Sequence, residues 1–296
     1  MNYIVLYDAS ITYYLIDLAI VLLILGSLRL CAGAIANSSL TEILSEKDNA
    51  AAGVSLAGAM LGVAIMMMGA VSGDAGGTPA EEAILMLIYG FLGIVLMWLT
   101  RIIFDRISLP SISISEEIHK DNLAAGLVDA GNMIASAIVV RALMTWVDGA
   151  TTSGIMAILL GYAISQVLLV LLSRYRTKLF AFRHKGASFE QAIMDKNTAL
   201  AVRFSGHRIG ASLAITAASG LVLYNPNDLW MVLAVWTAVA TVIFVAQTLV
   251  GVLTHMIFLP SIDVADEVGK QKNIAIGALE GAIYIAIGLV FAGLFG

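Results

Sequence analysis

Long apolar runs constrain the fold of this 296-residue chain more than any other feature. A helix needs roughly 20 consecutive apolar residues to cross the hydrocarbon core of a bilayer. Such runs occur at about 12–36, 49–72, 82–104, 122–147, 153–173, 197–223, 229–254 and 273–295. Only 12% of the residues are charged, and the mean hydropathy is +0.93. We therefore predict an all-α polytopic membrane protein with about eight transmembrane helices.

The connections between these runs alternate in length and charge. Those after the first, third, fifth and seventh runs are long and basic, whereas the others are short and lack Lys and Arg. Every Lys and Arg except Arg141, Arg203 and Arg208 lies in a basic connection or at the adjoining helix ends. Because positive loops stay in the cytoplasm, both termini are expected on the outer side of the membrane.

A short motif opens every second apolar run. Its last residue is an asparagine in all four copies, namely Asn49, Asn122, Asn197 and Asn273. Glycine follows four residues later in three copies, at Gly53, Gly126 and Gly277, while the third copy has Ala201. Similar connections around Pro110 and Pro260 lie half a chain apart. We predict four parallel two-helix repeats in two duplicated halves, 1–148 and 149–296, around an axis along the membrane normal.

The motif of a charged residue, Asn, Ala-x-Gly and a glycine-rich apolar helix resembles the DUF350 family, which includes the YjfL-like inner-membrane proteins. The resemblance covers all four helical hairpins, and the third copy departs from it by adding Arg203, His207 and Arg208. It implies a multi-pass protein of the bacterial cytoplasmic (inner) membrane with both termini periplasmic. The resemblance implies no established activity, and it links the chain only loosely to membrane-stress and cell-envelope systems.

Ionisable side chains fall on one face of the motif helices. On a helical wheel of about 100° per residue, Asp129 and Glu280 lie within about 20° of the opening asparagines, and so does Arg208. In a fourfold arrangement these faces are expected to converge on a central axis. Asn132, one turn beyond Asp129, is placed either to orient its carboxylate or to form a hydrogen bond between helices. Arg203 and His207 complete the candidate ion or solute site.

Two accounts fit these residues. In the first, Asp129 and Glu280 carry a proton or cation along the axis with Arg208 as counter-ion, because ionisable groups inside a bilayer usually serve function. In the second, the acids pair with Arg203 or Arg208 and hold the bundle together, while the glycines allow close helix approach. The two accounts correspond to a channel or transporter and to a non-transporting scaffold or envelope-stress protein that acts through a partner.

Other classes of function find little support in the sequence. It has no P-loop motif, no histidine pair at ligand spacing and a single cysteine, so we expect no enzyme activity, cofactor or metal site. The basic segment 174–187 suits anionic lipid head groups, and it is too short and too poor in stacking aromatics for nucleic acid. The expected partners are the lipid bilayer, anionic lipid at 174–187 and, if glycine faces meet between chains, a homo-oligomer.

Overall fold

The computed structural model describes residues 8–36, 41–72, 77–147, 149 and 151–296. Residues 1–7, which belong to the topology prediction for the N-terminus, lie outside this part. All the long elements of the described chain are helices. These elements are α1 (Asp8–Ala36), α2 (Ala50–Val71), α3 (Pro79–Ile103), α5 (Leu123–Trp146), α6 (Thr152–Arg183), α8 (Thr198–Thr216), α10 (Leu229–Phe258) and α12 (Ile274–Phe295).

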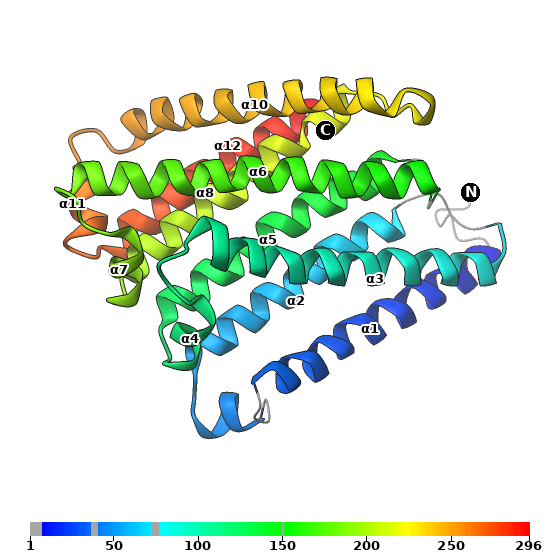
Figure 1. Cartoon of the computed structure of the whole chain (residues 1–296), viewed down its shortest axis with the longest axis horizontal. Helices are drawn as coiled ribbons and strands as arrows, with labels where there is room; N and C mark the ends of the chain where they lie inside the picture. Colours follow the sequence, from blue (N-terminus) through cyan, green and yellow to red (C-terminus); the bar gives the residue numbers. More distant parts are fainter. Residues whose placement is uncertain (1–7, 37–40, 73–76, 148, 150) are drawn as a thin grey trace, which may run out of the picture.

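Short helical elements connect the long ones at one end of the molecule. They are the π-helices η1 (Glu42–Glu46) and η2 (Phe104–Ser108) and the α-helices α4 (Ile114–His119), α7 (Phe189–Met194) and α11 (Val264–Gly269). In Figure 1, α4, α7 and α11 gather at the left end, where the basic connections also lie. At the other end, α9 (Ala218–Leu221) and the 3₁₀ turn η3 (Pro226–Asp228) connect α8 to α10.

The long helices form two layers. Helices α2, α5, α8 and α12, which the asparagine motif opens, lie side by side in that order: α2 packs on α5, α5 on α8, and α8 on α12. We call these four helices the row. Helices α3, α6 and α10 each lie over the groove between two neighbouring members of the row, and α1 packs on α2 and α3. Figure 1 shows α10, α6, α3 and α1 following one another from top to bottom.

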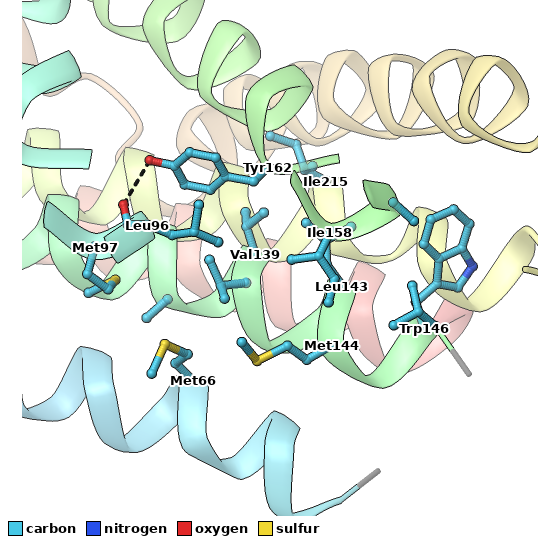
Figure 2. Close-up of a cluster of buried hydrophobic side chains, with 14 of the residues drawn as sticks. Met66, Leu96, Met97, Val139, Leu143, Met144, Trp146, Ile158, Tyr162 and Ile215 are labelled. Atoms are coloured by element: carbon cyan, nitrogen blue, oxygen red, sulfur yellow. Dashed lines mark hydrogen bonds between the residues drawn. The ribbon is translucent and has the colours of Figure 1, made fainter. Parts of the chain in front are cut away.

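Two large hydrophobic clusters of the described residues fill the space between the layers. One includes Met66 of α2, Met97 of α3, Leu143 of α5 and Ile158 of α6, and Figure 2 shows these side chains meeting between their helices. The hydroxyl of Tyr162 donates to the Leu96 carbonyl at 2.9 Å across the same cluster, which satisfies a buried polar group. The second cluster lies toward the basic end, around Phe104, Phe189 and Phe204.

Seven of the long helices in the described chain are long and apolar enough to cross a membrane. Helix α8 is not among them, because Arg203, His207 and Arg208 lie within its 19 residues. It nevertheless lies in the row between α5 and α12, which are both candidate spans. The all-α membrane architecture is therefore confirmed, and the count of eight crossings stays a prediction.

Candidate functional site

The motif asparagines cap the helices of the row. The side-chain oxygens of Asn49, Asn122, Asn197 and Asn273 each accept from backbone N–H groups in the first turn of their own helix. These N–H groups have no partner within a helix, so the cap satisfies them. The residue before each asparagine adopts a left-handed conformation, with φ between 47° and 58°. The repeated motif is thus a helix start at a fixed geometry.

The side-chain amides of the same asparagines also join one repeat to the next. Asn49 Nδ2 donates to the Ile118 carbonyl at 2.9 Å, Asn122 Nδ2 to the Ile193 carbonyl at 2.8 Å, and Asn197 Nδ2 to the Val268 carbonyl at 2.9 Å. Each acceptor belongs to the short helix of the following repeat. The sequence motif therefore has a structural role at every internal repeat boundary.

A carboxylate outside the membrane spans supports one of these links. Glu117 accepts from Lys120 at 2.8 Å and from Asn122 Nδ2 at 2.9 Å. The hydrogen bond from the Lys120 ammonium, followed by that from Asn122, holds the pKa of Glu117 below its ordinary value. Glu117 is thus held ionised, and it orients the amide that reaches Ile193.

The first intramembrane acid, Asp129 on α5, lies in a closed ion pair. Arg101 of α3 donates to its carboxylate through Nη2 at 2.7 Å and Nε at 3.3 Å. Ser55 Oγ of α2 donates to the same carboxylate at 2.5 Å and receives a hydrogen bond from Arg101 at 3.1 Å. The Asp129 side chain is buried away from water. The arginine and serine of this three-helix cluster therefore take the place of water around its charge.

The second acid, Glu280 on α12, lies in a different cluster. Arg203 of α8 contacts both carboxylate oxygens, with Nε–Oε2 at 2.6 Å and Nη2–Oε1 at 2.9 Å. Two histidine nitrogens face the same carboxylate at longer range, His207 Nε2 at 3.8 Å and His255 Nδ1 of α10 at 3.9 Å. Both nitrogens are buried and have no hydrogen-bond partner within the described chain.

Arg208, in the middle of the row, has no carboxylate partner among the described residues. Its guanidinium donates to Asn132 Oδ1 at 2.7 Å, to Ser173 Oγ at 2.6 Å and to the Leu169 carbonyl at 3.2 Å, and it lies 4.8 Å from the centre of the Phe104 ring. Only 1% of the residue is exposed. Neutral acceptors and one ring face therefore stabilise this buried cation.

A small cavity lies between α6, α7 and α8 near the basic end. Its volume is about 30 Å³, and its polar lining consists of Arg176, Arg183, His184, Arg203 and His207. A cavity of this size holds one or two water molecules. Its lining includes Arg203 and His207 of the Glu280 cluster and, at the basic end of α6, Arg183 and His184.

These positions correct the predicted arrangement of the site. The expectation of a common axis is wrong: α2 and α12 lie at opposite ends of the row, and Asp129 and Glu280 belong to separate clusters. Arg208 is not their counter-ion but the partner of Asn132. Asn132 therefore does not orient Asp129. The predicted pairing of Glu280 with Arg203 is present.

Three residues that contact Asp129 or Glu280 are not predicted from the sequence, namely Arg101, Ser55 and His255. Arg101 is one of the cations at the helix ends beside the basic connections, and the sequence does not distinguish His255 or Ser55 from other residues of their helices. A wheel that compares only the motif helices omits the helices of the second layer, which supply Arg101 and His255. The available signal was their position: Arg101 lies in the last turn of the run 82–104, and His255 directly follows the run 229–254.

The predicted motif glycines hold the row together. A Cβ on Gly126 would overlap the backbone of Ala51 in α2, and a Cβ on Gly277 would overlap that of Ala199 in α8. Small residues allow this approach between membrane helices. Gly53, at the same position in α2, faces no preceding row helix and has only Leu44 near it, at 3.7 Å.

The layered apolar helices, the buried ion pairs and the asparagine-linked repeats define a polytopic α-helical membrane protein built from tandem hairpins. The chain belongs to the DUF350 family, described as a domain of unknown function, whose model matches twice, at residues 6–144 and 150–295. The resemblance drawn from the asparagine motif is thereby confirmed.

A similar curated protein is the UPF0719 transmembrane protein of Aquifex aeolicus (strain VF5). It is 28% identical over 139 residues, which are 46% of this chain and 50% of that relative. The chain thus matches about half the length of this relative. No solved structure matches the chain.

Proposed function

We propose that the protein is a membrane scaffold, in which the row holds a partner or neighbouring molecules and carries no solute. One observation supports this choice over a carrier. The two acids on the helices of the row are both held by arginines of adjacent helices, at 2.7 Å for Asp129 and 2.6 Å for Glu280, in two clusters separated along the row. A carboxylate paired so closely stabilises the packing and gives up its charge only at a large free-energy cost.

Reconstituted vesicles test this proposal. Purified protein in liposomes is expected to show no proton or cation flux above that of empty vesicles. Asp129→Asn is expected to lower thermal stability in detergent, because the Arg101 guanidinium loses its counter-charge in a buried site. If the wild type supports flux, and Asp129→Asn abolishes it without lowering stability, the protein is a transporter and not a scaffold.

The basic end is the surface through which such a scaffold would meet its surroundings. Arg174, Lys178, Arg183 and Lys185 are exposed along the end of α6 and the turn that follows it. Each such cation near an anionic membrane surface contributes about 1 kcal/mol to attraction. We propose anionic lipid as the contact of segment 174–187, with vesicle co-sedimentation at low and high salt as the measurement.

The clustering of cations also supports a location. With the basic connections at one end, the positive-inside rule favours that end as cytoplasmic and the termini as periplasmic, in the inner membrane of a bacterium. We make no proposal of enzyme activity, and its absence stays a prediction.

A second candidate function rests on the Glu280 cluster. His207 and His255 both face its carboxylate at 3.8–3.9 Å, and the small cavity reaches Arg203 and His207 from the basic side. Histidines beside a carboxylate can pass a proton. For a proton carrier, Glu280→Gln would abolish pH-driven proton flux in liposomes, whereas Asp129→Asn would leave that flux intact.

A further inference from the structure

Each helix of the row has two packing faces. We number the residues of each row helix from its capping asparagine, which is position 0. Positions 2, 9 and 13 meet the following helix, and positions 4, 8 and 11 meet the preceding one. The contacts between α2 and α5 join Ala51 to Gly126, Gly58 to Ala130 and Gly62 to Met133. Those between α8 and α12 join Ala199 to Gly277, Gly206 to Gly281 and Gly210 to Tyr284.

The contact between α5 and α8 follows the same rule. Gly131 at position 9 meets Ser205 at position 8, and Ser205 Oγ also donates to the Leu127 carbonyl at 2.9 Å. The three internal contacts are therefore one interface used repeatedly, always with the later helix on the same side. Such a head-to-tail interface has no built-in end.

Polar links follow the same direction. Besides the asparagine amides, the residue before the asparagine reaches back to the previous repeat. Asp121 Oδ1 accepts from the Ala51 N–H at 3.2 Å, and Lys272 Nζ donates to the Asp195 carbonyl at 2.9 Å. Apolar close packing and these hydrogen bonds both specify one register between neighbours.

The first helix of the row leaves its preceding face open. On α2 this face consists of Gly53, Ala57, Met60 and Ala64. These are the same residue types, at the same positions, as the four residues with which α5 faces α2, namely Gly126, Ala130, Met133 and Ala137. Ala57 is exposed and Met60 is 45% exposed, because α1 lies in the second layer over α2 and α3.

The last helix leaves its following face open. Positions 2, 9, 13 and 20 of α12 are Ala275, Ala282, Ala286 and Gly293, and all four are exposed. The corresponding residues of α2, Ala51, Gly58, Gly62 and Gly69, are buried against α5. Alanine replaces glycine at position 9, so a helix on this face would lie slightly farther away than in the internal contacts.

The polar links at this end are also incomplete. Asn122 Nδ2 donates both to its own Glu117 and to Ile193 of the next repeat, whereas Asn273 Nδ2 has only its own Glu267, at 2.8 Å, within the described chain. An amide nitrogen carries two hydrogens, so Asn273 keeps one for a following repeat. In all three internal links the acceptor directly follows the residue whose carbonyl receives the N–H of its own repeat's asparagine. In the first repeat Asn49 N–H donates to the Ile43 carbonyl, so the corresponding acceptor is the carbonyl of Leu44.

We infer that α12 of one molecule packs against α2 of a second copy of this chain and continues the row across molecules. The occupant is a second copy because the open face of α2 repeats the face of α5 and the open face of α12 repeats the small-residue pattern. All helices of the row run in one direction, so both copies keep the same membrane orientation. Glu280 lies on the same helix but faces Arg203 of α8, away from the open face. The inference names the neighbouring molecule that the proposed scaffold would hold, and it does not depend on whether the protein carries a solute.

Disulfide cross-linking in intact membranes tests the inference. In a Cys31→Ser background, Ala282→Cys and Ala57→Cys are combined in one chain, which reproduces the pairing of positions 9 and 8 at the internal contacts. Oxidation is expected to give covalent dimers and longer species on non-reducing gels. Both positions are exposed in the single chain, so neither variant disturbs folding.

Three comparisons make the test decisive. Each cysteine alone should give no dimer, since a head-to-tail contact never brings two copies of one position together; a dimer from Ala57→Cys alone would indicate a two-fold contact and overturn the inference. Ala282→Cys with Phe91→Cys, at a residue 71% exposed on α3, measures random collision. A yield for the Ala57 pair no higher than this collision control would mean that lipid alone covers both faces. Adding Ala286→Trp should abolish the cross-link.

Discussion

Arg208 is a buried, charged residue whose hydrogen-bond partners are all neutral. Asn132, Ser173 and the Leu169 carbonyl accept from its two terminal nitrogens, while Nε has no hydrogen-bond partner within the described chain. Removing the charge and removing an acceptor are not equivalent. Without the guanidinium the neutral acceptors are left behind, whereas without an acceptor the cation itself is left short of a partner.

Stability measurements on two variants therefore have an expected order. Arg208→Met should lower the free energy of unfolding by about 1–2 kcal/mol, the range for neutral groups left without a partner. Asn132→Leu should lower it by about 3 kcal/mol, because a buried charge loses a hydrogen bond. Thermal unfolding in detergent measures both. If Arg208→Met lowers the free energy of unfolding more than Asn132→Leu does, the charge of Arg208 itself stabilises the protein.

Glu117 gives the protein a defined pH dependence near its basic end. The folded chain holds the Glu117 pKa below its ordinary value through Lys120 and Asn122. A carboxyl group whose pKa is lowered by folding stabilises the protein above its unfolded pKa, and this contribution disappears as pH falls through the folded pKa. The loss should therefore begin below a pH of about 4.

The Glu117→Gln variant isolates this effect. At neutral pH it should melt at a lower temperature than the wild type, and the difference between the two should shrink as pH falls below about 4. Glu116→Gln, at the exposed neighbouring residue, serves as the control and should follow the wild type. A difference that does not vary with pH would show that the Glu117 charge has no part in the link to Asn122.

At the scale of helices, the glycines separate into those that a neighbour requires and those that it does not. A Cβ on Gly58 would overlap the backbone of Ala130, while a Cβ on Gly26 of α1 would meet nothing within 4 Å. Gly58→Ala should lower the free energy of unfolding by about 2 kcal/mol through overpacking. Gly26→Ala should be neutral or raise it by up to about 1 kcal/mol, because alanine favours the helix.

The same measurement, thermal unfolding in one detergent, compares the two glycine variants directly. Each replaces glycine by alanine inside an apolar helix, so hydrophobicity and helix propensity change equally. Equal effects would show that α2 and α5 can separate enough to admit a methyl group, and the close approach of the row would lose its energetic importance.

Individual elements were predicted from the sequence to very different degrees. The asparagine motif located the starts of α2, α5, α8 and α12 correctly, because capping is local chemistry. Arg101 as the partner of Asp129 was missed, since nothing in the order of residues says that α3 lies over the groove between α2 and α5. The helix wheel placed the acids on one face of the motif helices, and the convergence of these faces on a common axis was an assumption.

At the scale of the whole molecule, the motif helices form a row and not the ring that convergence on a common axis implies. In a ring of four, each motif helix contacts its two neighbours through faces about 90° apart, whereas in a row the two faces lie on nearly opposite sides of the helix. At 100° per residue, positions 2, 9 and 13 lie about 150° around the helix from positions 4, 8 and 11. Positions 2, 9 and 13 supply the second face in all four repeats, as Ala51, Gly58 and Gly62 do in the first. The sequence therefore contained the evidence for the row. The membrane class was predictable from the length of the apolar runs alone.

The path of α8 decides how the two halves of the row sit in the membrane. The helix has 19 residues, about 28 Å at 1.5 Å per residue, which nearly matches the hydrocarbon core of about 30 Å. Its polar groups are inside the protein, with Arg208 only 1% exposed, so they do not prevent a crossing. The α7 end and the α9 end of α8 should then lie on opposite sides of the membrane.

Cysteine labelling with a membrane-impermeant reagent tests this crossing directly. In a Cys31→Ser background, Ala187→Cys lies in the basic connection before α7, and Asn227→Cys lies in the turn before α10; both residues are exposed. On intact cells Asn227→Cys should be labelled and Ala187→Cys protected, and inverted vesicles should reverse the result, because the basic side stays cytoplasmic. Labelling of both from one side would mean that α8 does not cross, and α5 and α12 would then run in opposite directions through the membrane, which the parallel packing of the row does not allow.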